Sequence, residues 1–175
     1  MSSSAGFLTL CCVLSVNLCT LVAFPAHPCK LKEMLKRLEH EIKGLNSTLL
    51  VNHVHYHAEV IPALVIDKSL PIHKQNETAA CGLVYVTKAL EQIQDHYSKL
   101  IHDDQIQRQF NVIMTRLNEY ISPCARLVLA KCNNVPHPTF PDSHFHAKNW
   151  TRNFLESSVK FIHRLIHFLE KAQTV

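Results

Sequence analysis

The chain contains little glycine, three residues in 175, and none of them belongs to a Gly-rich phosphate-binding loop. It also lacks a GxSxG nucleophile elbow and an HExxH zinc motif. These absences remove the common signatures of nucleotide-binding proteins, serine hydrolases and zinc proteases. We therefore predict that the protein is not an enzyme and that it carries no cofactor.

A strong excess of either charge is also missing. Lysine and arginine together number 18 and aspartate and glutamate 14, which gives a formal net charge of +4. The basic residues are spread along the chain without a dense run, so we expect no nucleic-acid partner. A length of 175 residues is enough for one domain with its own hydrophobic core.

The first 24 residues carry no charged side chain and contain the apolar runs FLTLCCVL and LCTLVAF. This composition is typical of a secretory signal peptide, so we predict that residues 1–23 are cleaved after Ala23 and that residues 24–175 form the mature domain. An uncleaved signal anchor is the alternative, because the run is nearly long enough to span a bilayer and basic residues follow it. No later segment resembles a membrane span, so we expect no membrane insertion of the mature domain.

The cysteines and the glycosylation sequons agree with export. Three of the seven cysteines lie in the leader, and the remaining four could form two disulfides in an oxidising compartment, although their spacing leaves three pairings open. The spacing fits no zinc motif such as CxxC. We therefore expect a secreted glycoprotein with disulfides among Cys29, Cys81, Cys124 and Cys132 and with sequons at Asn46, Asn76 and Asn149.

Four stretches have the apolar spacing of amphipathic helices. Gly44 and Asn46 are expected to stop the first, and Thr78 is expected to cap the start of the second. Pro123 should end or kink the third, and Ser122 could then cap a short continuation. The four predicted helices cover residues 31–46, 78–97, 104–121 and 149–172.

The connection lengths indicate how these helices are arranged. The second and third helices are joined by about six to nine residues and should lie antiparallel, whereas residues 47–77 and 133–148 form long connections. The sequence therefore predicts an all-α protein, a short-chain up-up-down-down four-helix bundle with two long crossovers. The segment VNHVHYHAEVIPALVID in the first crossover alternates like a strand and could pair with the second crossover as a small two-stranded ribbon.

The closing helix has an apolar arc wider than a surface helix needs. Because a crossover bundle can cover this arc with another helix or with the first crossover, burial is the better explanation, and functional contacts are expected on the opposite, basic and histidine-rich side. The arc consists of Leu155, Val159, Ile162, Ile166 and Leu169, flanked by Trp150, Phe154, Phe161, Leu165 and Phe168.

Four short motifs resemble the interleukin-4/interleukin-13 family of short-chain helical cytokines. They are EMLKRL from Glu33, NETAAC ending at Cys81, TRLN from Thr115, and NFLE from Asn153. Three departures from interleukin-4 are evident: the cysteine that ends its last helix is absent, Glu119 replaces an arginine, and His163 with Ile166 replaces an arginine and a tyrosine. The runner-up is the interleukin-3/interleukin-5/GM-CSF family, which ISPC at residues 121–124, Trp150 and LEKAQ at residues 169–173 resemble.

The resemblance implies a monomeric ligand that brings two type I cytokine receptor chains together in type 2 immunity. The expected partners are the interleukin-4 receptor alpha chain with the common gamma chain or an interleukin-13 receptor alpha-like chain. It also implies disulfides between Cys81 and Cys132 and between Cys29 and Cys124. The first receptor is expected to contact Glu33, Lys36, Arg37, His40 and Arg116, and the second Arg152, Lys160, His163 and His167.

Other interpretations remain open for these residues. The charged positions could be ordinary solvated helix surface, with pairs such as Glu33 with Lys36, and Ile166 could be a core residue rather than a contact. His53, His55 and His57 alternate, and His163 and His167 are spaced to share a metal ion, but no carboxylate completes a clear set, so we predict no metal site. A secreted helical carrier of an apolar ligand is the alternative of another class, with the aromatic row of the last helix lining its cavity.

Overall fold

All the regular secondary structure in the described part of the chain is helical. The computed structural model describes residues 29–49, 59–100, 103–135 and 137–172, and it contains no strand within them. The all-α class is therefore confirmed. Within the same ranges, no helix is long and apolar enough to cross a membrane. The elements are α2 (Leu31–Leu49), the 3₁₀ helix η1 (Pro62–Leu64), α3 (Ile72–Leu100), α4 (Asp104–Thr115), the π-helical turn η2 (Arg116–Ile121), α5 (Ser122–Val128) and α6 (His144–Ala172).

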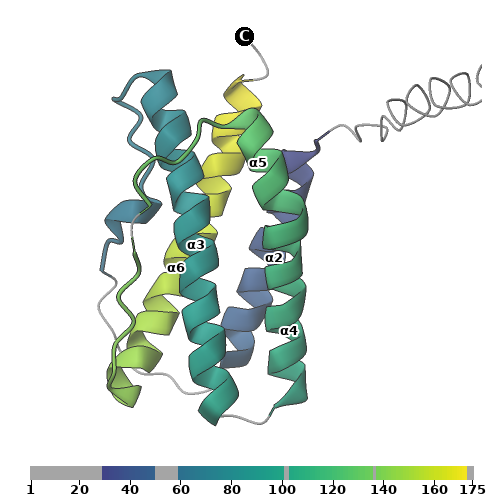
Figure 1. Cartoon of the computed structure of the whole chain (residues 1–175), viewed down its shortest axis with the longest axis vertical. Coiled ribbons are helices and arrows are strands. Elements are labelled where there is room, and N and C mark those ends of the chain that lie inside the picture. Colours follow the sequence, from purple (N-terminus) through teal and green to yellow (C-terminus); the bar gives the residue numbers. More distant parts are fainter. Residues whose placement is uncertain (1–28, 50–58, 101–102, 136, 173–175) are drawn as a thin grey trace, which may run out of the picture.

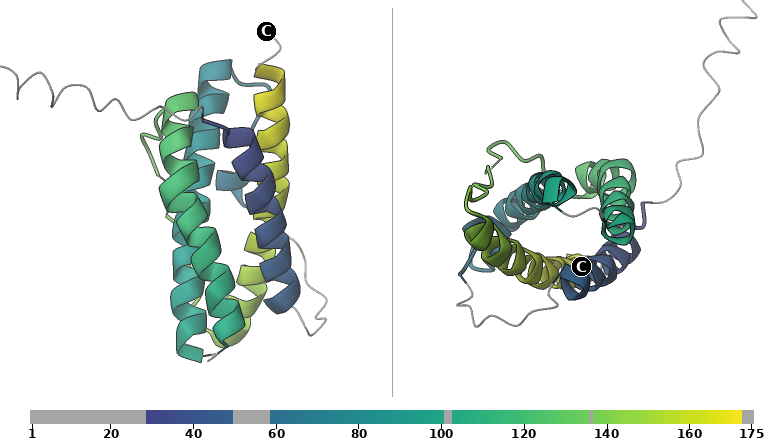
Figure 2. Two further views of the ribbon diagram at one scale, coloured as in Figure 1. Left: turned by 90° about the vertical axis from the view of Figure 1, so that its right-hand side faces the viewer. Right: turned by 90° about the horizontal axis from the view of Figure 1, so that it is seen from below.

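The long helices lie side by side around one core (Figure 1). In that view α2 and α3 run downwards, whereas the continuous rod α4–η2–α5 and the helix α6 run upwards. Seen along the axis, α2 and α3 lie diagonally opposite each other, and each contacts both of the other two rods (Figure 2). The pairing of α2 with α6 is the most extensive. The chain between α5 and α6 passes along the length of the molecule.

The first helix continues past the predicted stop. Gly44 and Asn46 are both helical, and α2 ends only at Leu49. The hydroxyls of Ser47 and Thr48 donate hydrogen bonds to backbone carbonyls one turn earlier. Because the buried stripe of α2 continues to Leu45, packing against the core outweighs the local stop signals.

The second helix also starts earlier than the sequence predicts. It begins at Ile72, directly after Pro71, and the carbonyl of Pro71 accepts hydrogen bonds from the backbone N–H groups of Lys74 and Gln75. Proline is suited to a helix start because its fixed φ is already helical and it has no N–H to leave unpaired. The prediction that Thr78 caps this helix is wrong, since its hydroxyl donates to the carbonyl of Lys74 inside the helix.

Pro123 does not end the third rod. The turn that precedes it, Arg116–Ile121, is π-helical, and the N–H of Ser122 donates to the carbonyl of Leu117, five residues earlier. This wider turn lies where proline can neither donate a hydrogen bond nor tolerate the close carbonyl of a regular α-helix. Ser122 has helical backbone angles and makes no side-chain cap, so the predicted recapping is wrong.

The first crossover contains no strand where it is described. Residues 51–58 of the predicted strand, with His53, His55 and His57, lie outside the described residues. The remainder includes the 3₁₀ helix η1, which packs against α3 and α6, and the predicted ribbon is not found in the described part of either crossover. The amide of Asn153 donates a hydrogen bond of 3.0 Å to the carbonyl of Glu59 and so attaches this crossover to α6.

The wide apolar arc of the closing helix is buried. α6 begins at His144, ahead of the predicted start, and Phe154 and Phe161 are fully buried. The ring of Phe161 lies against the backbone of Gly82 on α3, where any Cβ atom would overlap it. Ile166 is also a core residue, with 5% of its surface exposed, so burial explains the arc.

One disulfide joins the start of α2 to α5, and a second joins α3 to the second crossover. Cys29, just before α2, is bonded to Cys124 on α5, and Cys81 on α3 is bonded to Cys132 in the second crossover. This is the pairing that the resemblance implies. The sequence separations are 95 and 51, so each cross-link is worth about 4–5 kcal/mol in the chain-entropy description.

Candidate functional site

A groove lies between α2 and the rod α4–η2. It has a volume of about 660 Å³, and we call it the α2–α4 groove. Residues one helical turn apart on each rod form its walls because side chains three and four positions apart share a helix face. The lining residues used below are Glu33, Met34 and Arg37 from the α2 side and Val112, Arg116 and Tyr120 from the other rod.

The α2–α4 groove combines exposed apolar surface with charge. Val112 is 50% exposed and Tyr120 is 54% exposed, so both present apolar surface to solvent in the groove. Glu33 and Arg37 are exposed on the facing wall. Aromatic and arginine side chains beside apolar surface are the groups that carry most binding energy in protein interfaces.

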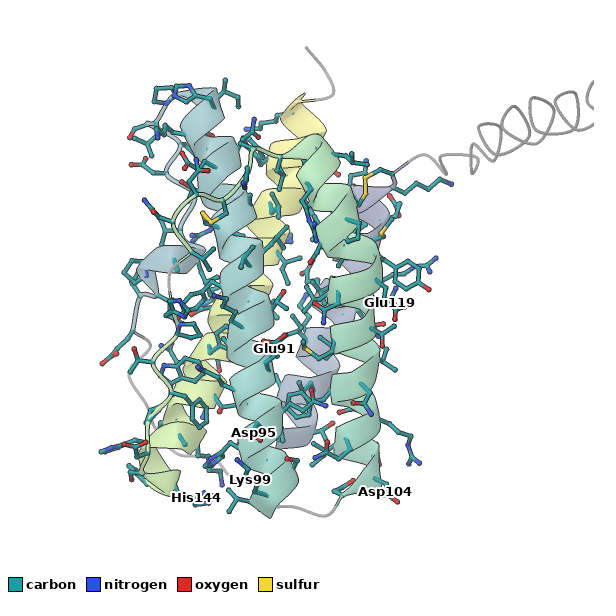
Figure 3. All side chains as sticks on the ribbon, viewed as in Figure 1. Glu91, Asp95, Lys99, Asp104, Glu119 and His144 are labelled. Carbon is teal, nitrogen blue, oxygen red and sulfur yellow. A yellow bond between two sulfur atoms is a disulfide. The ribbon has the colours of Figure 1, made fainter. Side chains whose placement is uncertain are left out.

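The π-helical turn contributes directly to this surface. Tyr120 lies within η2, and the additional residue in a π turn changes the direction of the side chains that follow it. Glu119, in the same turn, is exposed on the outer edge of the rod (Figure 3). Single π turns often occur at functional sites.

Arg116 is held by an internal ion pair that the sequence did not indicate. Its Nε donates to Oε2 of Glu41 at 2.7 Å and its Nη2 donates to Oε1 at 2.6 Å, and both side chains are 22% exposed. These hydrogen bonds raise the pKa of the Arg116 guanidinium further above its usual high value. The pair links α2 to η2, so Arg116 forms the wall of the groove while its charge is matched within the chain.

The other residues predicted for the first contact surface are divided by the structure. Glu33 and Arg37 line the α2–α4 groove. Lys36 is exposed, and its Nζ lies 3.6 Å from a carboxylate oxygen of Glu33, the pair that the sequence suggested. His40 is exposed but lines a separate, smaller hollow further along α2.

The residues predicted for the second contact surface follow one side of α6. Arg152 donates to Glu156 at 3.1 Å, and Lys160 is exposed beside a small hollow at the first crossover. His163 and His167 are exposed, and their Nε2 atoms are 3.2 Å apart. The successive spacings from Arg152 to Lys160, His163 and His167 are eight, three and four residues, which place the four side chains on one helix face that we call the α6 stripe.

A second histidine cluster lies at the end of α3. The ring of His96 is 5.0 Å from the ring of Phe140 and 5.8 Å from that of His144, which starts α6 near Lys99 (Figure 3). Burial lowers the pKa of His96, and the nearby His144 and Lys99 lower it further. The packing therefore favours the neutral imidazole.

The sequons and the metal candidates are placed as follows. Asn46, Asn76 and Asn149 all lie on helices and are half-buried. In the ranges that the structure describes, no group of three or more histidine, cysteine, aspartate or glutamate side chains converges to hold a metal ion.

Comparisons with the models of protein families, with characterised proteins and with solved structures found no match to this chain.

Proposed function

We propose that the protein is a secreted signalling ligand of the short-chain helical cytokine type, interleukin-4/13-like, which brings two receptor chains together. The observation that carries this proposal is the combination of architecture and cross-links. Two parallel helical rods are followed by two that run the opposite way, and this order supports the proposed up-up-down-down bundle with two long crossovers. The disulfides Cys29–Cys124, between the start of α2 and α5, and Cys81–Cys132, between α3 and the second crossover, have the pairing that the cytokine resemblance implies.

The α2–α4 groove is the proposed contact for the first receptor chain. Glu33 can accept charge-assisted hydrogen bonds, Arg37 can donate them, and Tyr120 and Val112 supply apolar area between them. Arg116 acts here as a positioning residue, since its charge is already matched by Glu41. The α6 stripe is the proposed contact for the second chain.

Receptor capture by surface plasmon resonance tests the proposal. The mature protein is passed over the ectodomains of the interleukin-4 receptor alpha chain and of the common beta chain. We expect binding to the former, with Tyr120→Ala and Arg37→Glu each weakening it at least tenfold, mainly through a faster off-rate. Lys99→Ala, at the far end of α3, is the matched surface control and should bind within about twofold of the native protein.

Three outcomes would change the assignment. Capture by the common beta chain alone would favour the interleukin-3/interleukin-5/GM-CSF family. Capture by neither ectodomain would refute both cytokine assignments. An apolar molecule that copurifies with the protein and is detected by native mass spectrometry would favour the carrier, although the described core is filled by side chains such as Phe110, Phe154 and Phe161.

A further inference from the structure

Two histidines and two carboxylates meet where α6 packs against α2. His163 and His167 are one turn apart on α6, and their Nε2 atoms face each other at 3.2 Å. The opposite ring nitrogens face carboxylates. Nδ1 of His167 is 3.2 Å from Oε2 of Glu170, and Nδ1 of His163 is 3.6 Å from Oε1 of Glu39 on α2.

Two proton assignments are open to a pair of neutral rings, because the 3.6 Å separation of His163 Nδ1 from Glu39 is too long for a hydrogen bond and excludes neither of them. His167 donates from Nδ1 to Glu170, which leaves a lone pair on its Nε2. If His163 carries its proton on Nε2, it donates to His167 but turns a lone pair on Nδ1 towards the Glu39 carboxylate. If it carries the proton on Nδ1, two Nε2 lone pairs face each other at 3.2 Å.

In the second assignment both Nε2 lone pairs point towards the same place, and a cation between them accepts both. We propose that His163 and His167 bind a divalent metal ion of the imidazole-preferring class, Zn²⁺ first, through their Nε2 atoms. Two Zn–N bonds of about 2.0–2.1 Å at a tetrahedral angle place the nitrogens about 3.3 Å apart, close to the spacing present. Glu170 is the outer partner that holds the His167 ring, in the usual carboxylate–histidine–metal arrangement, and the Glu39 carboxylate lies 3.6 Å from the outer nitrogen of His163. Water completes the coordination of the ion.

Neighbouring charges and solvent exposure determine how tightly this site binds a metal ion. Nζ of Lys43 lies 2.7 Å from the same Glu39 oxygen, and Nζ of Lys32 lies 3.9 Å from Glu170. The two ammonium groups interact with the same carboxylates, so these carboxylates polarise the imidazole rings less strongly. Both histidines are about 60% exposed, which leaves room for water ligands. The site therefore binds more weakly than a structural zinc site with four protein ligands.

This inference departs from the sequence-based expectation of no metal site. That expectation counted carboxylates as ligands and found none to complete the set. In the structure the carboxylates lie behind the rings, and one of them comes from another helix. The inference does not depend on the proposed function, because metal binding is measured on the isolated protein.

Histidine NMR on the native protein provides the test. Long-range ¹H–¹⁵N spectra are recorded at pH 7.5 during a ZnCl₂ titration and again after addition of EDTA. We expect the Nε2 signals of His163 and His167 to shift together and to return with EDTA. His163→Gln and His167→Gln should each weaken Zn²⁺ binding at this pair at least tenfold, and Glu39→Gln should weaken it severalfold.

His73→Gln is the matched control, since His73 is an exposed histidine on α3, and it should leave the titration of the pair unchanged. The proposal is overturned if Zn²⁺ leaves both ring signals in place. It is also overturned if the pair holds only a shared proton, seen as an imidazolium signal at pH 7.5 that Zn²⁺ does not displace. Both exclusions use the native protein, so they do not depend on the folding of any variant.

Discussion

The ion pair between Arg116 and Glu41 should stabilise the fold and shape the α2–α4 groove at the same time. A double-mutant cycle with Glu41→Gln, Arg116→Met and the double variant isolates its contribution. The guanidinium donates two parallel hydrogen bonds, of 2.6 and 2.7 Å, and both side chains are 22% exposed. Charge-assisted bonds with this geometry are among the strong ones, and partial exposure to solvent reduces them.

We expect each single substitution to lower the free energy of unfolding by about 2 kcal/mol, because the remaining charge is left partly buried. The coupling energy of the pair should be about 1–2 kcal/mol. Urea denaturation followed by circular dichroism measures both quantities. The pair of Lys99 with Asp95 on α3 is the control, since its side chains are 69% and 67% exposed and its coupling should stay below about 0.5 kcal/mol.

A coupling energy no larger than that of the control would refute this reasoning. Receptor capture gives a second, independent check. If Arg116 acts by positioning the groove, Glu41→Gln and Arg116→Met should weaken binding by similar factors. If Arg116 instead contacts the receptor itself, its substitution should weaken binding far more than that of Glu41.

Three further predictions concern packing, pH and folding. Gly82→Ala should lower the free energy of unfolding by about 0.5–2 kcal/mol, because the new methyl group overlaps the ring of Phe161. Gly44→Ala, on open helix surface, should raise the free energy of unfolding by about 1 kcal/mol. Urea denaturation of both variants measures the two changes. Because the pKa of His96 is lowered in the folded state, the neutral ring contributes fully to the free energy of unfolding above the unfolded-state pKa of about 6.5. This contribution is lost as the pH falls through the lower folded-state pKa. The drop in melting temperature between pH 7 and pH 5 should therefore be smaller for His96→Asn than for the native protein. Cys81→Ser should reduce the secreted yield and the melting temperature, and an unchanged value of both would contradict the role given to this disulfide.

The middle of each helix and the start of α4 at Asp104 could be predicted from the sequence, but several other helix ends could not. The apolar stripes of the four predicted helices are buried as expected, since burial of a periodic stripe depends on spacing alone. The ends depend on which of several local signals the packing favours. Pro71 starts α3 ahead of Thr78, and Gly44 is carried inside α2 because the stripe continues beyond it.

The candidate site was only partly predictable, for a different reason. Glu33 and Arg37 were found by resemblance and do line the groove. Tyr120 and Glu41 were missed. The exposure of Tyr120 depends on a π turn, and Glu41 pairs with a residue 75 positions away. Contacts between helices that are distant in sequence leave no periodic pattern in either helix.

The helix α2 contributes to both candidate surfaces through neighbouring carboxylates. Glu39 faces His163 on α6, and Glu41 faces Arg116 on η2. Two positions along an α-helix correspond to a rotation of about 200°, so these side chains point to opposite sides of α2. Both are acidic and both meet a basic group on another rod, yet they support different surfaces. Glu39→Gln should therefore change the contacts of the α6 stripe and leave the α2–α4 groove intact, whereas Glu41→Gln should do the reverse. Comparing these two variants of one helix tests the two proposed contact surfaces independently.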